Sequence, residues 1–155
     1  MTSSAPADSM CHCFAVRQAA RTVSQLYDQH LAPSGLRATQ FSILMKLHAH
    51  GDLQIGNLAA RMHMDRSTLG RNVLPLQREG LVEVVEAEGD RRAKPLHITA
   101  AGIARLKIAR PLWKKAQHAY EAACGAEEAA ELSARLHDVA RAVRGVTPEG
   151  APLPE

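Results

Sequence analysis

Apolar residues recur three or four positions apart along most of this chain, which is the spacing of one face of an α-helix. The pattern predicts a first helix from about Phe14 to Leu31, ended by "APSG". A second helix is expected over "ATQFSILMKLHAHG", with Thr39 as its N-cap and Gly51 as its C-terminal stop. Its buried side would consist of Ile43, Leu44 and Leu47.

Two shorter helical segments follow in close succession. "QIGNLAARM" would turn Leu58 and Ala59 inward, and "DRSTLGRNVLPLQREG" begins with a capping Asp65 and ends at Gly80. The inward face of the latter segment would consist of Leu69, Val73 and Leu76. Two short helices across the tight turn "MHM" predict a helix-turn-helix.

The pattern then changes from helix to strand. "LVEVV" and "PLHIT" are short runs rich in β-formers, and the charged segment "EAEGDRRAK" joins them. We therefore expect a two-stranded hairpin with a basic tip directly after the helix-turn-helix. Together these elements predict a winged helix-turn-helix.

Two long helices are predicted after the hairpin. Thr99 would cap the first, whose apolar stripe runs from Leu106 to Ala123, and the second would end near Arg144. The stripe of this last helix consists of Ala129, Leu132, Leu136, Val139 and Val143. A small winged domain cannot cover these stripes, so we expect a second copy of the chain to pack on them.

Composition supports a mainly helical, single-domain protein. The 155 residues are 46% hydrophobic but only 3% aromatic, and alanine and leucine favour packed helices. The expected fold class is mainly α (α+β), a winged helix-turn-helix core with a two-stranded β wing between long dimerisation helices. The expected boundaries are a disordered tail at 1–9, one domain at 10–144 with its winged part at about 37–99 and dimerisation helices at about 10–32 and 100–144, and a disordered tail at 145–155.

Charge and targeting signals indicate which partners and which compartment to expect. A formal charge of +3 and a pI of about 9.0 permit a nucleic-acid partner without requiring one. No secretory leader and no apolar run of membrane-spanning length is evident. We therefore expect a cytoplasmic protein with no membrane partner, whose three cysteines are reduced at rest.

The second helix of the pair carries side chains suited to DNA. Recognition helices contact bases from their N-terminal turns, where this chain places Arg66, Ser67, Thr68, Arg71 and Asn72. Arg71 could bind guanine O6 and N7, whereas the hydroxyls suit base edges or phosphates. A basic helix face on its own is more often merely solvated, but the adjoining wing favours DNA.

The wing adds cations at the hairpin tip. Asp90, Arg91, Arg92 and Lys94 bring three positive charges and one negative charge, and Asp90 would orient one of the arginines. Arginines on a β tip suit the negative potential of a narrow minor groove. Double-stranded DNA is therefore the expected partner.

The segment "LAARMHMDRSTLGRNVLPLQREGLVEVVEAEGDRRAKPLHITAAG" resembles the core of the MarR family of winged-helix transcription regulators. The resemblance extends over about residues 10 to 144 and implies a homodimer that binds a pseudo-palindromic operator, usually as a repressor relieved by an effector. The chain departs from the family pattern at His63 in the turn, at Pro75 inside the recognition helix, and at Arg37 and Gln54, where threonine caps are usual.

The N-terminus resembles a subgroup of that family, the organic-hydroperoxide-sensing regulators. Its reactive cysteine lies in a "CFA" context, which is matched here by Cys13, and Tyr27 matches a tyrosine that contacts the thiolate. Arg17 replaces a second tyrosine, although an arginine one turn along the helix would favour a thiolate. Cys124 is similar to a resolving cysteine of some members. A cysteine can equally be a small core residue.

Three other interpretations remain open. A small phenolic or aromatic acid could be the effector, with Arg17, Arg21, Phe41 and Trp113 lining its pocket. Cys11, His12 and Cys13 could hold a metal only from a frayed segment, because C-x-C directs two sulfurs apart on a helix, so no metal or other cofactor is expected. An enzyme is not expected either: no hydrolase or nucleotide motif appears, and a thiol oxidoreductase usually carries C-x-x-C.

Overall fold

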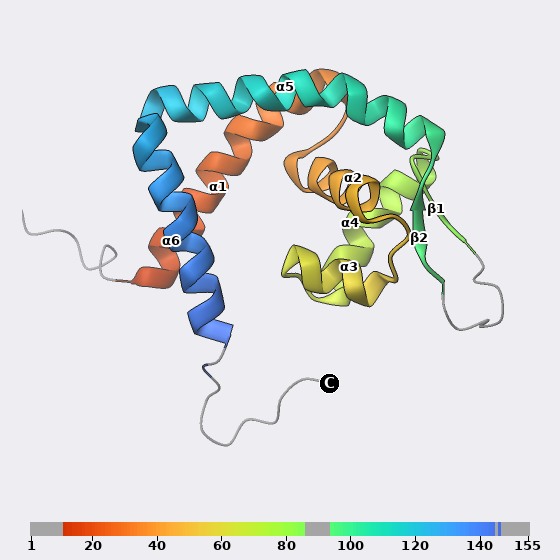
Figure 1. Ribbon diagram of the computed structural model, residues 1–155, viewed down its shortest axis with the longest axis horizontal. Coiled ribbons are helices and arrows are strands. Elements are labelled where there is room, and N and C mark those ends of the chain that lie inside the picture. The colour runs from red at the N-terminus through yellow and green to blue at the C-terminus, as the bar shows by residue number, and fades with distance from the viewer. Residues whose placement is uncertain (1–10, 86–93, 145, 147–155) are drawn as a thin grey trace, which may run out of the picture. The chain divides into compact units, whose positions relative to one another are not determined.

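The architecture of the chain is known from a computed structural model, which describes residues 11–85, 94–144 and 146 (Figure 1). The described elements are mainly helical, with one two-stranded antiparallel sheet. In chain order they are α1 (His12–Leu31), the 3-10 helix η2 (Ala32–Ser34), α2 (Ala38–His50), α3 (Ile55–Met62), α4 (Arg66–Arg78), β1 (Val82–Val84), β2 (Leu96–Ile98), α5 (Ala100–Cys124) and α6 (Ala126–Arg144). The predicted fold class is confirmed.

The chain divides into two compact units. The first runs to Ala116 and holds α1 to β2 with most of α5, and the second begins at Gln117 and holds the end of α5 with α6. Apart from Val146, the expected tails lie outside the described residues, and so does the predicted hairpin tip with Asp90, Arg91 and Arg92. No described helix combines the length and hydropathy needed to cross a membrane.

The start of α2 differs from the sequence prediction. Its N-cap is Arg37, not Thr39, and the helix begins at Ala38. The backbone N–H of Ala38 donates to Asp28 Oδ1 of α1 at 2.7 Å, and the N–H of Arg37 donates to Gln40 Oε1 at 3.0 Å. The Asp28 carboxylate and the Gln40 side chain accept hydrogen bonds from these two N–H groups. Because of this, α2 does not need a threonine cap.

The helix-turn-helix forms as predicted around an aliphatic core. The side chains of Leu44, Leu58, Leu69 and Leu76 are fully buried, and they belong to α2, α3 and α4. His63 takes the left-handed conformation in the turn, with φ of 55°. Histidine adopts that conformation more often than most residues other than glycine. The chain therefore turns sharply between α3 and α4.

The hairpin is joined to this core by its two strands and by a third segment, which the periodicity of the sequence did not indicate. Val82 pairs with Ile98 and Val84 with Leu96, as the two β-rich runs predict. Leu53, between α2 and α3, forms an isolated antiparallel bridge to Leu96. β2 is thus paired on both of its edges, with β1 and with the segment that holds Leu53.

The beginning of α5 connects several elements of the first unit. Thr99 Oγ1 accepts from the N–H of Gly102 at 3.1 Å, which confirms the predicted cap. Arg105 Nη1 donates to Glu79 Oε2 at 3.1 Å and to the carbonyl of Ser34 at 3.2 Å. One guanidinium therefore joins the C-terminal end of α4 to the segment after α1.

The apolar stripe of α6 is largely uncovered in a single chain. Ala129 is buried, but Leu136 is 44% exposed. The other exposed members of the stripe are Leu132, Val139 and Val143. The expectation that a second copy of the chain covers this row stays a prediction.

Candidate nucleic-acid interface

Asp65 fixes the first turn of α4. Its Oδ1 accepts from the N–H of Thr68 at 2.8 Å and from Ser67 Oγ at 2.7 Å, while Oδ2 accepts from Thr68 Oγ1 at 2.6 Å. These bonds, led by that of the Thr68 hydroxyl, hold the pKa of Asp65 well below its usual range. The carboxylate therefore stays charged at neutral pH, and the N-terminal turn has a fixed conformation.

The same turn orients the predicted base-reading residues. Arg71 Nη2 donates to Thr68 Oγ1 at 3.2 Å, and Asn72 Nδ2 donates to the carbonyl of Thr68 at 2.9 Å. Since the hydroxyl protons of Ser67 and Thr68 are used by Asp65, both side chains offer mainly acceptor oxygens to a ligand. Thr68 is thus the centre of a network that positions the guanidinium of Arg71.

The two faces of α4 are sharply different. Leu69, Val73 and Leu76 are buried, as the sequence predicts, whereas Arg66 and Arg71 are exposed. The guanidinium of Arg66 passes close to Gly56 of α3, where an added Cβ would lie 3.0 Å from its Nη2. Gly56 therefore leaves room for Arg66 to lie across α3.

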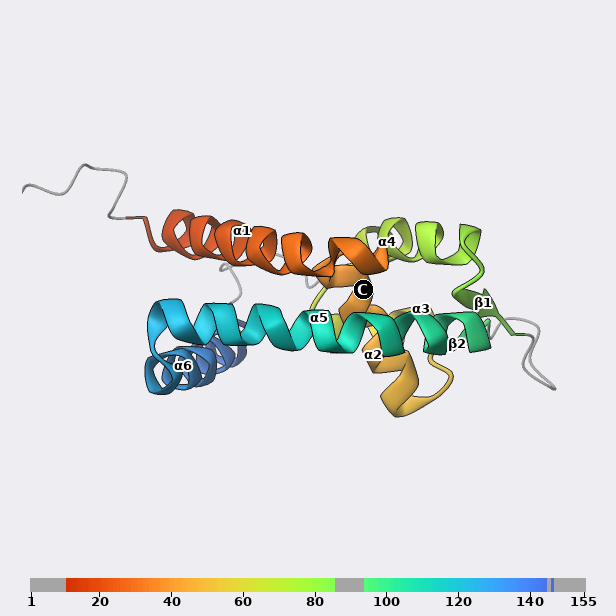
Figure 2. The same ribbon diagram turned by 90° about the horizontal axis from the view of Figure 1, so that it is seen from above.

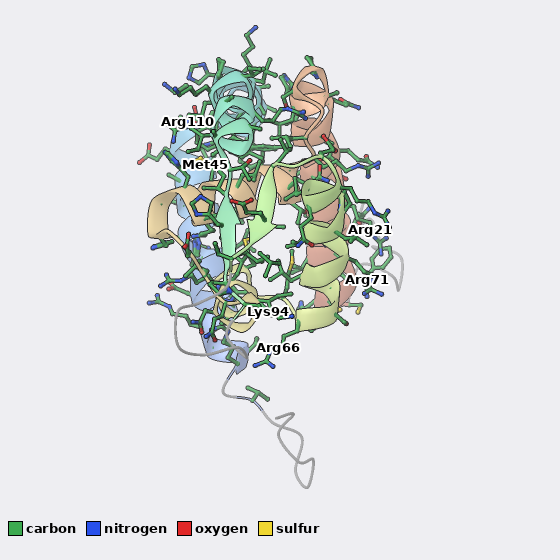
Figure 3. The ribbon with its side chains drawn as sticks, turned by 90° about the vertical axis from the view of Figure 1, so that its right-hand side faces the viewer. Arg21, Met45, Arg66, Arg71, Lys94 and Arg110 are labelled. Carbon is green, nitrogen blue, oxygen red and sulfur yellow. The ribbon has the colours of Figure 1, made fainter. Side chains whose placement is uncertain are left out.

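The described base of the wing adds a further cation. Lys94 is exposed just before β2, and Figure 3 shows Lys94 and Arg66 toward one end of the first unit, with Arg110 of α5 at the opposite end. His97 Nδ1 lies 2.6 Å from Asp52 Oδ1, which connects β2 to the turn before α3. Cations of the helix-turn-helix and of the wing base thus gather in one region.

A hollow of about 320 Å³ lies between α1, the start of α2 and α4, and we call it the α2–α4 hollow. Its lining includes Ser24, Asp28, Arg37, Thr39, Arg71 and Asn72. Arg37 was seen in the sequence only as an unusual cap. The sequence signal was a cation at a position where a capping oxygen is preferred, but its proximity to Arg71 depends on tertiary packing.

The predicted effector pocket does not coincide with this hollow. Phe41 and Trp113 stack with ring centroids 5.9 Å apart, and Phe41 is 5% exposed. Their rings fill space within the first unit, and Arg17 and Arg21 are exposed on α1. None of these four residues lines the α2–α4 hollow.

The cysteines occupy two separate regions of the sequence. Cys11 is the N-cap of α1, and its Sγ accepts from the N–H of Phe14 at 3.4 Å. Cys13 is exposed in the first turn, and Tyr27 on the same helix is half-buried. Cys124 is exposed at the end of α5, in the second unit. All three are free thiols.

Comparisons with known proteins agree with this geometry. Residues 36–94 match the model of the MarR family. The transcriptional regulator MosR of M. tuberculosis is 36% identical over 90% of this chain and 100% of its own, with a TM-score of 0.78. A structure of the same regulator in complex with DNA is 39% identical over 86% of this chain and 98% of its own, with a TM-score of 0.74.

A more distant likeness concerns the fold alone. PcaV of Streptomyces coelicolor, solved with its natural ligand, is 22% identical over 90% of this chain and 99% of its own, with a TM-score of 0.78. A comparison with curated proteins gave no match.

Proposed function

The chain belongs to the MarR family of transcriptional regulators, and from this premise we propose that it is a homodimeric repressor that leaves a pseudo-palindromic DNA operator when an effector acts. The observation that carries the proposal is the exposed, prearranged face of α4, on which Asp65 and Thr68 orient Arg71. The DNA complex of the 39% identical regulator supports it. The proposed location of this function is the cytoplasm.

An electrophoretic shift on the DNA upstream of the protein's own gene tests the proposal. A repressor should retard one short duplex at concentrations at which random DNA of equal length stays free. The assay is run with and without organic hydroperoxide and with and without reductant, so that it also examines the effector. Equal retardation of operator and random DNA at every salt concentration would contradict a sequence-specific role.

Arg71→Ala should weaken binding to the operator by about 1–3 kcal/mol, because Arg71 is placed to bind a guanine edge in the major groove. Binding to random DNA should change much less. Titration of both duplexes by fluorescence anisotropy measures the two losses. Arg78→Ala, which removes the same exposed side chain from the last turn of α4, is the matched control. Equal losses on both duplexes would show that Arg71 contacts only phosphate.

The proposed effector is an organic hydroperoxide acting at Cys13. The thiolate attacks one peroxide oxygen, which yields a sulfenic acid and releases an alcohol after proton transfer. A thiol such as that of Cys124, in the partner subunit, could then displace water and form a disulfide. Such a bridge would pull on the long helices and change the spacing of two recognition helices that must fit grooves one helical turn apart.

Cys13→Ser should remain on the operator in the presence of hydroperoxide, whereas the wild-type protein should be released and should rebind after dithiothreitol. Cys11→Ser is the matched control, because serine retains an acceptor for the N–H of Phe14 and should still respond. A loss of response in Cys11→Ser would assign the reaction to Cys11. Release of Cys13→Ser together with wild type, or release by a phenolic acid alone, would contradict redox sensing at Cys13.

A further inference from the structure

The α2–α4 hollow borders the side chains that the proposed function directs at bases. Arg71 and Asn72 belong to the recognition helix, and Arg37 and Thr39 come from the start of α2. Viewed from above, α1 and α4 lie on the same side of α5 (Figure 2). The residues that line the hollow come from α1, the start of α2 and α4. A ligand in the hollow would therefore lie next to the bases that α4 contacts in the proposed complex.

Arg37 has no evident structural task at this position. A guanidinium offers only donors, so Arg37 cannot cap α2 with its side chain, and no side-chain cap bond is present. Asp28 and Gln40 accept from the first N–H groups of the helix in its place. The Arg37 side chain is exposed, and the ion pairs between described residues do not include it.

The charge of the hollow suits an anion. Arg37 and Arg71 supply two cations, and the one carboxylate of the lining, Asp28, already accepts from the N–H of Ala38. Thr39 adds a hydroxyl that can donate to an oxygen ligand. Both cations make the hollow favourable for an anion, and the guanidinium of Arg37 beside the hydroxyl of Thr39 is a donor pair suited to a phosphate.

The position of the hollow indicates that the anion is a phosphate of the DNA backbone. The major groove is about 12 Å wide, so a helix inside it has a sugar–phosphate backbone close on each side. With α4 in the groove, an element packed alongside α4 faces one of these walls, and the start of α2 is such an element. Roughly half or more of the hydrogen bonds between proteins and DNA go to phosphates and sugars.

We propose that Arg37, with Thr39, binds one backbone phosphate in each half-site of the operator and so fixes the register in which Arg71 meets the bases. The inference rests on the proposed DNA-binding function and adds a contact outside both the recognition helix and the wing. It assigns different roles to two neighbouring arginines, since Arg37 would bind DNA of any sequence and Arg71 would discriminate between sequences.

Arg37→Asn tests this assignment without weakening the fold. Asparagine is a preferred N-cap, so the melting temperature should stay equal to that of the wild type or rise. Affinity for the operator and for random DNA should fall by a similar factor, about tenfold or more, and the slope of log K against log salt should lose about one unit per protomer. Ethylation interference should lose one sensitive phosphate in each half-site.

Two further variants complete the experiment. Arg37→Lys keeps the charge and should retain most of the salt slope, while Arg110→Ala removes an equal charge at the opposite end of the first unit and should leave the slope and the interference pattern unchanged (Figure 3). If the wild type shows no preference for the operator, the proposed function fails. If the wild type binds specifically but Arg37→Asn keeps its slope and all sensitive phosphates, the role of Arg37 is overturned and the proposed function stands.

Discussion

Leu136→Asp is expected to convert the protein from a dimer into a monomer and to weaken operator binding about 100-fold or more. Leu136 lies in the exposed apolar row of α6, which a second copy would cover in the proposed dimer. A carboxylate there would lose its hydration without gaining a cation, and an unpaired buried charge is strongly unfavourable. A monomer would also lose the second half-site, which supplies much of the affinity of a dimeric regulator.

Sedimentation velocity measures the mass, and the operator shift measures the second effect. Ala134→Asp introduces the same carboxylate on the opposite face of α6, so it is the matched control and should remain dimeric. If Leu136→Asp sediments like the wild-type dimer, the α6 stripe does not form the interface, and if the wild type is itself a monomer, the homodimer proposal is wrong.

Gly102→Ala should destabilise the protein by about 3 kcal/mol, the upper part of the range for overpacking. Helix propensity alone would predict the opposite sign, since alanine is better than glycine by about 1 kcal/mol inside a helix. Gly102 is buried near the start of α5, and an added Cβ would overlap the carbonyl oxygen of Leu81 and lie 2.7 Å from Ile98 Cγ1. A backbone oxygen cannot move aside without displacing the hairpin.

Urea unfolding followed by circular dichroism gives the change in free energy. Gly70→Ala is the matched control, because it also lies inside a helix but has only Ile55 Cδ1, at 4.0 Å, near the added Cβ. That variant should be neutral or more stable by up to about 1 kcal/mol. A Gly102→Ala protein as stable as Gly70→Ala would mean that the contact between α5 and the hairpin relaxes at little cost.

Most secondary structure could be predicted from the sequence because its determinants are local. The inward row of Leu69, Val73 and Leu76 follows from helical spacing, and the Asp65 cap follows from a side chain that reaches an N–H three residues away. The order of helices, hairpin and long helices was sufficient to indicate the fold. The exposed stripe of α6 was likewise visible as an apolar row with no partner in a small domain.

The contacts that join elements could not be read from the pattern. Thr39 was expected to cap α2, but Asp28 of α1 accepts from the N–H of Ala38 instead. A hydrogen bond between two helices leaves no signal in the spacing of apolar residues. The bridge from Leu53 to Leu96 joins residues far apart in the sequence, and the exclusion of a side chain at Gly102 depends on where the Leu81 carbonyl lies.

The sequence by itself determined which residues of this protein form helices, which face of each helix is apolar, and which side chains begin the recognition helix, because each follows from spacing within one segment. Only the tertiary structure decided that Arg37 and Arg71 line one hollow and that Phe41 stacks on Trp113. In both cases the two residues belong to segments that are far apart in the sequence, and the packing of the whole core decides which residues meet.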